Sequence, residues 1–148
     1  MRWKLTIFSL IVASLAGCDN APPTASGAEW IEPSNAVKLA AASPDDGVTG
    51  VFYMTVKATG MTDRLHLNSE SDYRDQRNLS IAVEPAAAKE LAEALGAPPQ
   101  FALKDKRILV IGTAKRARIV FTTGGLPTDK YYYQTHVVVT KASQIKVL

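Results

Sequence analysis

Cysteine is almost absent from this chain of 148 residues, which has one, Cys18, and only two histidines, His66 and His136. A single cysteine excludes a disulfide within one molecule and the paired-cysteine spacing of structural zinc sites. A zinc site needs about four ligands, and two histidines on outward-facing positions of different predicted strands do not supply them. We therefore predict no metal and no other cofactor, and we interpret both histidines as solvent-exposed or structural.

Catalytic motifs are also lacking. No Gly-x-Ser-x-Gly elbow occurs, and Thr123-Gly124-Gly125 runs into Leu126-Pro127, which is typical of a turn rather than a phosphate-binding loop. The stretch Asp72–Arg77 joins acids to arginines, a combination that could hold a metal and stabilise a developing phosphate charge. Its six residues are contiguous, however, and on one loop opposite charges pair with each other. The sequence therefore predicts a protein that is not an enzyme.

A hydrophobic run long enough to span a membrane is missing too. The apolar stretch from Leu5 to Leu15 is about half of the roughly 20 residues that a spanning helix needs. Arg2 and Lys4 precede it, and small residues follow it. A charged start, a short apolar middle and small residues before a cut are typical of an export signal.

The end of this signal carries a recognisable motif. Leu15-Ala16-Gly17-Cys18 resembles the lipobox of bacterial lipoproteins. The resemblance implies that residues 1–17 are a signal peptide, that Cys18 receives diacylglycerol, and that cleavage makes it the first residue. The alternative is an ordinary secreted protein, which would keep an unpaired thiol in an oxidising compartment.

The residues after Cys18 suggest where the protein resides. Two or more acyl chains, palmitate among them, give stable membrane attachment. Asp19 resembles the inner-membrane retention signal of Gram-negative lipoproteins, so we expect a lipid-anchored protein on the periplasmic side of the cell membrane. The segment 18–29 is small, polar and Pro-bearing, which is typical of a flexible tether.

Charge of either sign is not in excess once the signal is removed. Loss of Arg2 and Lys4 lowers the formal net charge from +3 to about +1. A nearly neutral domain makes no case for bulk attraction to nucleic acid. The length of residues 30–148 predicts one domain with one core, which we expect to be monomeric.

Hydrophobic periodicity then predicts the elements of this domain. Ser34 or Asn35 is expected to cap a short helix that ends at Ala42. A longer helix begins at Pro85 and carries an apolar stripe of Ala88, Leu91, Ala92 and Leu95, with Gly96 as its stop. The expected strands lie around 52–57, 64–68, 79–83, 104–121 (with Gly112 as a bulge or bend) and 131–140, with a short edge segment at 144–147.

Three strands, a helix and two more strands form the chain order of the OB-fold, a five-stranded barrel. The phrases LHLNSESDYRDQRNLSIAV, LKDKRILVIGTA and ASQIKVL resemble the small OB-fold domains of bacterial exported proteins. The resemblance covers roughly residues 34–148 and implies a mainly β, OB-fold-like barrel with a short N-terminal helix. Another small antiparallel sheet packed on a helix would also fit the pattern.

OB domains usually hold ligands on an outward face of their first strands. We therefore predict a ligand face there, continued by two residues of the loop after the second strand. The predicted face consists of Tyr53, Lys57, Arg64, His66, Asn68, Tyr73 and Arg74.

Three functions remain open on the sequence. We favour a non-catalytic binding or adaptor module of the cell envelope, with an unknown protein, peptide or glycan as its partner. A single-stranded nucleic-acid binder is the second, because Tyr131–Tyr133 lies on a strand next to Lys115, Arg116 and Arg118. A hydrolase or phosphodiesterase of the envelope is the third.

Overall fold

The computed structural model describes residues 29–148. The predicted signal peptide, Cys18, Asp19 and nearly all of the predicted tether lie outside these residues. Within the described part of the chain, no helix is long and apolar enough to cross a membrane.

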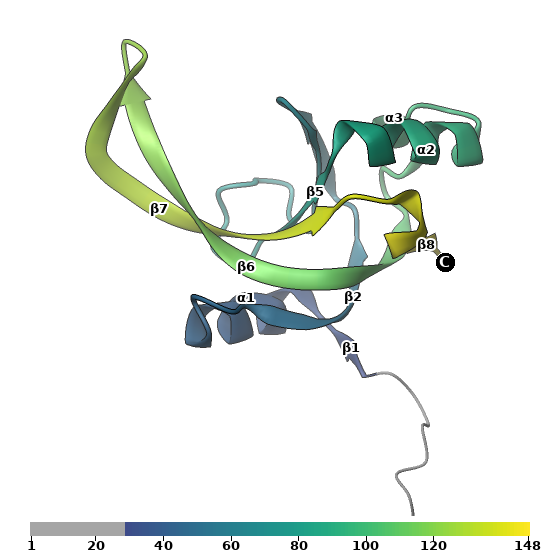
Figure 1. The fold of residues 1–148 in the computed structure, drawn as a ribbon, viewed down its shortest axis with the longest axis horizontal. Helices are drawn as coiled ribbons and strands as arrows, with labels where there is room; N and C mark the ends of the chain where they lie inside the picture. The colour runs from purple at the N-terminus through teal and green to yellow at the C-terminus, as the bar shows by residue number, and fades with distance from the viewer. Residues whose placement is uncertain (1–28) are drawn as a thin grey trace, which may run out of the picture.

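The described chain is mainly β, as predicted, with a few short helices (Figure 1). The elements are β1 (Trp30–Ile31), α1 (Pro33–Ala42), β2 (Val48–Thr55), β3 (Ala58–Met61), β4 (Leu65–Asn68), β5 (Leu79–Val83), α2 (Pro85–Leu95), α3 (Pro99–Ala102), β6 (Arg107–Thr123), β7 (Leu126–Val139), the 3-10 turn η1 (Ala142–Gln144) and β8 (Ile145–Val147).

One strongly curled sheet contains all the strands. Its order is β1-β2-β6-β7-β5-β4-β3, and β8 pairs with β6. Strands β2 and β3 stand near opposite ends of this order, yet only Val56 and Lys57 separate them in the chain. The sheet must therefore curl until its two ends meet at this bend, which gives the curved outline seen in Figure 1.

The core fills the inside of the curl. Its largest buried side chains come from β2, β4, β5 and β6, with Phe52, Leu67, Ile81 and Val110 fully buried. Helix α2 adds Ala87 and Leu91 to the same cluster. Gly96 ends this helix in the left-handed conformation with φ 68°, and its N–H donates to the Ala92 carbonyl, as the sequence predicted.

Strands β6 and β7 form a long antiparallel hairpin, here named the arm, which extends beyond the rest of the sheet (Figure 1). Its turn uses Gly124 and Gly125, both with positive φ, which only glycine adopts without strain. A register shift between Val120 and Thr122 interrupts the ladder near the tip.

Several predicted details are wrong. Residues 29–148 form eight strands rather than five, because β3 at 58–61 follows the expected first strand as a separate strand, and β1 and β8 are short edge strands, of which only β8 was predicted, as the edge segment at 144–147. Helix α1 begins at Pro33 after Glu32, and neither Ser34 nor Asn35 caps it. Gly112 is not a bulge, since it lies in an unbroken β2–β6 ladder, and a Cβ there would come within 2.7 Å of Val137 Cγ1, so close packing explains this glycine.

Candidate functional site

A pocket of about 700 Å³ lies between the β3–β4 pair and the arm. We name it the outer pocket. Its walls are Ala58, Thr59, Gly60, Met61, Thr62, Asp63, Arg64, His66, Asn68, Ser71, Tyr73, Ser80, Ile119, Tyr132, Gln134 and His136.

Strand register explains why these side chains gather here. Side chains directly opposite one another in a sheet point to the same face. Gly60 lies opposite His66 in the β3–β4 pair, and Ser80 of β5 lies opposite His136 of β7. The alternation along β7 then adds Gln134 and Tyr132 to the face that carries His136.

The two histidines meet at the floor of the outer pocket. The ring centroids of His66 and His136 are 5.7 Å apart, in an edge-to-face arrangement. Both side chains are half-buried. They lie on different strands and outside the core, as predicted, but the sequence did not predict that they meet, because this depends on the parallel β5–β7 pairing of residues that are far apart in sequence.

Hydrogen bonds determine which ring nitrogen of His66 carries the proton. Thr62 Oγ1 donates its only hydrogen to Asp63 Oδ1 at 2.8 Å, so it must accept from His66 Nε2 at 3.3 Å. The Nε2 atom of His66 then carries the proton, and Nδ1 accepts from Ser80 Oγ at 3.2 Å. Both nitrogens of His66 are thus engaged.

His136 belongs to a second chain of hydrogen bonds. Its Nε2 lies 2.7 Å from Gln134 Oε1, which can only accept, so Nε2 donates. Gln134 Nε2 donates to the Tyr132 hydroxyl, also at 2.7 Å. In neutral His136 this leaves Nδ1 as an acceptor with no hydrogen-bond partner among residues 29–148, and it leaves the Tyr132 hydroxyl proton available to a ligand.

The two charged residues that line the outer pocket, Arg64 and Asp63, balance each other, and Glu84 lies outside the lining. Arg64 Nη1 lies 2.8 Å from Glu84 Oε1, and Arg64 Nη2 lies 3.2 Å from Asp63 Oδ2. Burial lowers the pKa of His66, and the positive charge of Arg64 adds a smaller effect in the same direction. Burial, with smaller contributions from His66 and Arg64, lowers the pKa of His136 to about 4. Both rings are therefore neutral at pH 7, and the pocket presents hydroxyl, amide and imidazole groups rather than a net charge.

The depressed pKa of His136 predicts a loss of stability in acid. The unfolded chain binds a proton at His136 below about pH 6.5, whereas the folded chain binds it only below about pH 4. Folding stability should therefore fall as the pH drops through this window, by at most about 3 kcal/mol. Urea unfolding at pH 7 and pH 4.5 checks this.

A matched variant isolates the contribution of His136 from that of the nearby groups Arg64, Asp63 and His66. His136→Gln keeps a donor but does not titrate, so its stability should change less between the two pH values than that of the wild type. Equal pH dependence in both proteins would contradict the prediction.

The residues of the predicted ligand face do not lie together. Arg64, His66, Asn68 and Tyr73 line the outer pocket. Tyr53 and Lys57 line a separate, smaller hollow beside α1, where the Tyr53 ring stacks on Trp30 at 5.6 Å and Lys57 pairs with Glu70 at 2.9 Å.

Asn68 and Arg74 also differ from the predicted ligand face. Asn68 was expected to face solvent, but it is only 4% exposed, and its Oδ1 accepts a hydrogen bond from Asn78. Arg74 belongs to a further hollow under the arm. The turn of the sheet at Val56 and Lys57 sends the two halves of the predicted face to different sides.

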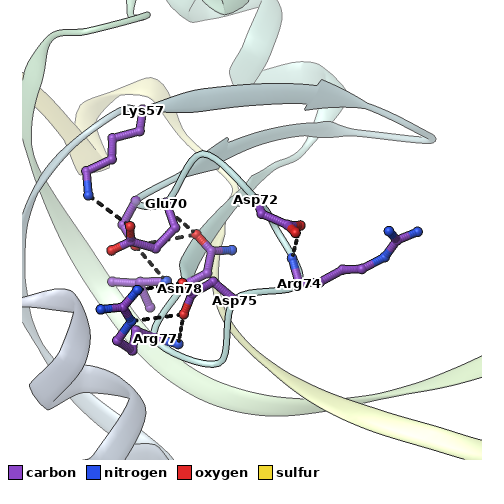
Figure 2. Close-up of polar contacts among 9 residues, drawn as sticks. Lys57, Glu70, Asp72, Arg74, Asp75, Arg77 and Asn78 are labelled. Atoms are coloured by element: carbon purple, nitrogen blue, oxygen red, sulfur yellow. Dashed lines mark hydrogen bonds and ion pairs between the residues drawn. The ribbon is translucent and has the colours of Figure 1, made fainter.

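The loop between β4 and β5 pairs part of its own charge, as the sequence predicted (Figure 2). Arg77 Nη2 lies 2.7 Å from Asp75 Oδ2, and the backbone N–H of Arg74 donates to Asp72 Oδ1 at 2.9 Å. Hydrogen bonds from Arg77 lower the pKa of Asp75 to about 2. This loop is therefore held in one shape beside the outer pocket.

Sequence reasoning missed Tyr132, Gln134 and His136 as pocket residues. The spacing of these three residues indicated that they share one face of the strand, because residues two apart on a strand point the same way. The local sequence does not say that this is the same face of the sheet as the one that carries His66. No group of three or more His, Cys, Asp or Glu in residues 29–148 could hold a metal ion.

Comparisons with known proteins were made on sequence and on structure. No family model matches the chain, and no curated protein matches it in sequence. The fold is similar to part of an aspartyl tRNA synthetase from Entamoeba histolytica, with a TM-score of 0.48 and 13% sequence identity. The alignment covers 99% of this chain, which spans 28% of the synthetase chain.

Proposed function

We propose that this protein is a membrane-anchored, periplasm-facing lipoprotein that acts as a non-catalytic binding or adaptor module of the cell envelope. Its ligand would be an uncharged, polar one, either a glycan or a segment of a protein or peptide, held in the outer pocket. The observation that carries this proposal is the balanced charge of that pocket together with the outward donor of Tyr132 and acceptor of His136.

The walls of the outer pocket support such a ligand. Ligand sites are usually concave and largely apolar, with a few well-placed polar groups. Met61, Ile119 and Tyr73 supply apolar and aromatic surface, and Tyr73 is 46% exposed. Aromatic rings suit the apolar faces of sugars and of peptide side chains.

We further propose that the curled sheet is an OB-type barrel in which residues 48–61 act as one bent strand. Three observations support this. The chain then runs through three strands, a helix and two strands, the third and fifth of these strands (β5 and β7) pair in parallel, and the bent strand pairs with both β4 and β6. The outer pocket would then lie on the face where OB domains hold ligands.

Replacement of Gly60 by a larger residue tests whether the outer pocket binds the ligand. Gly60 has ordinary strand geometry, and a Cβ on it would meet nothing within 4 Å. Because Gly60 lies opposite His66, the side chain of Gly60→Val would enter the outer pocket without disturbing the core.

A photo-crosslinking residue at the exposed position of Met61 should capture a defined envelope component in intact cells, and Gly60→Val should reduce this capture at least fivefold. The control Lys146→Val, at an exposed residue of β8, should leave the capture unchanged.

The anchor is tested in the same cells with Cys18→Ser, because serine cannot form the thioether to diacylglycerol. We expect the variant to lose membrane attachment and to keep residues 1–17. Capture that persists in Gly60→Val would contradict the binding site, whereas Cys18→Ser that still matures and stays with membranes would contradict the anchor.

A further inference from the structure

A second hollow, of about 550 Å³, lies on the opposite side of the arm, against α1 and the β4–β5 loop. We name it the inner groove. Tyr131 and Tyr133 line it, whereas Gln134 and His136, which lie on the other face of β7, line the outer pocket. The alternation of a strand thus places Tyr131 and Tyr133 in one hollow and Gln134 in the other, while Tyr132 lies at the border and lines both.

Arginines cover the tyrosine rings of the inner groove. The guanidinium carbon of Arg116 lies 3.8 Å from the ring centre of Tyr133, and that of Arg118 lies 4.1 Å from the ring centre of Tyr131. The two rings also meet edge to face, with centres 5.6 Å apart. Each guanidinium thereby lies over the face of a ring, and its N–H groups can still bind an anion.

The inner groove has positive charge without a compensating acid. Arg74 and Arg116 line it, and no carboxylate does. Of the acids of the β4–β5 loop, Asp75 pairs with Arg77 and Glu70 pairs with Lys57, whereas Asp72 accepts the backbone N–H of Arg74 and does not line the groove (Figure 2). Among residues 29–148, no ion pair involves Arg74, Arg116 or Arg118.

We propose that the inner groove is a second binding site, which takes an extended acidic segment of a partner protein. A planar guanidinium can bind a carboxylate with two parallel hydrogen bonds, which a lysine cannot do. Arginine and tyrosine are also the residues that most often dominate protein interfaces. Val37, Ala41 and the 46% exposed Phe121 add apolar surface for side chains between the acids.

Two observations favour a protein segment over other anions. Single-stranded nucleic acid binds by stacking bases on open aromatic faces, but here the guanidinium groups already occupy a face of each ring. The tip of the arm and β1, where the described chain begins, lie at opposite ends of the molecule (Figure 1). If the chain is anchored before β1, the tip of the arm is far from the attachment point, where a partner can reach it.

The experiment measures binding of the full chain, purified in detergent, to three probes. These are a twelve-residue peptide of alternating Glu and Leu, the same peptide with Gln in place of Glu, and a twelve-nucleotide oligothymidylate. We expect the Glu peptide to bind at least tenfold more tightly than the other two probes. Arg116→Lys combined with Arg118→Lys keeps the charge and should still weaken binding about tenfold, because the stacked, two-pronged contact is lost.

Arg107→Gln is the matched control, since Arg107 is an exposed arginine at the other end of the same strand. It should leave the affinity within twofold of the wild type, and all variants should melt at the wild-type temperature. Tighter binding of the oligothymidylate, no preference for Glu over Gln, or an unchanged affinity in the double lysine variant would overturn the proposal.

Discussion

Replacement of Leu91 by Asp should unfold the domain. Leu91 is 4% exposed and lies on the face of α2 that closes the core, beside Ala87. No basic residue of the same helix lies on that buried face, since Lys89 is exposed. A carboxylate there would be desolvated without a partner, at a cost of several kcal/mol. Small domains have a total stability of about 5–15 kcal/mol, so the loss should be visible as a missing cooperative melt.

A matched change on the exposed face of the same helix separates burial from helix propensity. Ala94→Asp places the same side chain at an exposed position of α2. It should cost only about 1 kcal/mol, mainly because a negative charge opposes the helix dipole near its C-terminus. If Leu91→Asp and Ala94→Asp melted alike by circular dichroism, α2 would not be closing the core.

Helix α2 also illustrates what the sequence could predict. Its apolar stripe, its proline at the first turn and its glycine stop are all local signals, and the structure has the helix at Pro85–Leu95 with Gly96 as its C-cap. The hairpin turn at Gly124 and Gly125 was predictable for the same reason. Signals of this kind depend on residues within one turn or one strand.

The site could be predicted only in part, because it depends on pairing between distant strands. His66 and His136 meet because their strands, β4 and β7, lie on either side of β5 in the sheet. The sequence of neither strand predicts this strand order. The strand β3 was missed for a related reason. Val56 exchanges backbone hydrogen bonds with the turn after α3, accepting from Asp105 and donating to Lys106, so the chain pairs again as β3 only at 58–61, beyond the expected strand at 52–57.

Burial of polar residues was the other failure. Asn68 and Ser80 alternate with leucine and isoleucine, so the pattern placed them in solvent. In the structure both are nearly fully buried, because the β4–β5 loop and the arm cover the outer face of these strands. Alternation predicts which residues share a face, but it does not say whether that face is covered by something else.

Asn78 is the polar residue on which this covered face most depends, and Asn78→Ala should lower the stability by about 3 kcal/mol. Its side chain is 3% exposed. Oδ1 accepts from the backbone N–H of Glu70 at 3.1 Å and from Ser69 Oγ at 3.4 Å. Nδ2 donates to Asn68 Oδ1 at 3.1 Å and to the Tyr73 carbonyl at 3.4 Å. Alanine would remove all four of these hydrogen bonds, of which the two with Ser69 and Asn68 are buried.

The effect should extend from stability to the shape of the loop. Asn78 ties the start, middle and end of the β4–β5 loop together, and this loop brings Tyr73 to the outer pocket and Arg74 to the inner groove. Urea unfolding should give the lost free energy, and hydrogen exchange at the Glu70 amide should quicken far more than at the Ile81 amide in β5. Gln76→Ala, an exposed change on the same loop, should cost less than about 0.5 kcal/mol.

Asn78→Asp provides the sharper test, because it keeps the acceptors for Ser69 and Glu70 but turns a charged oxygen toward the Asn68 and Tyr73 oxygens. It should therefore destabilise at least as much as alanine, and a stability equal to that of the wild type would show that the loop does not depend on this amide.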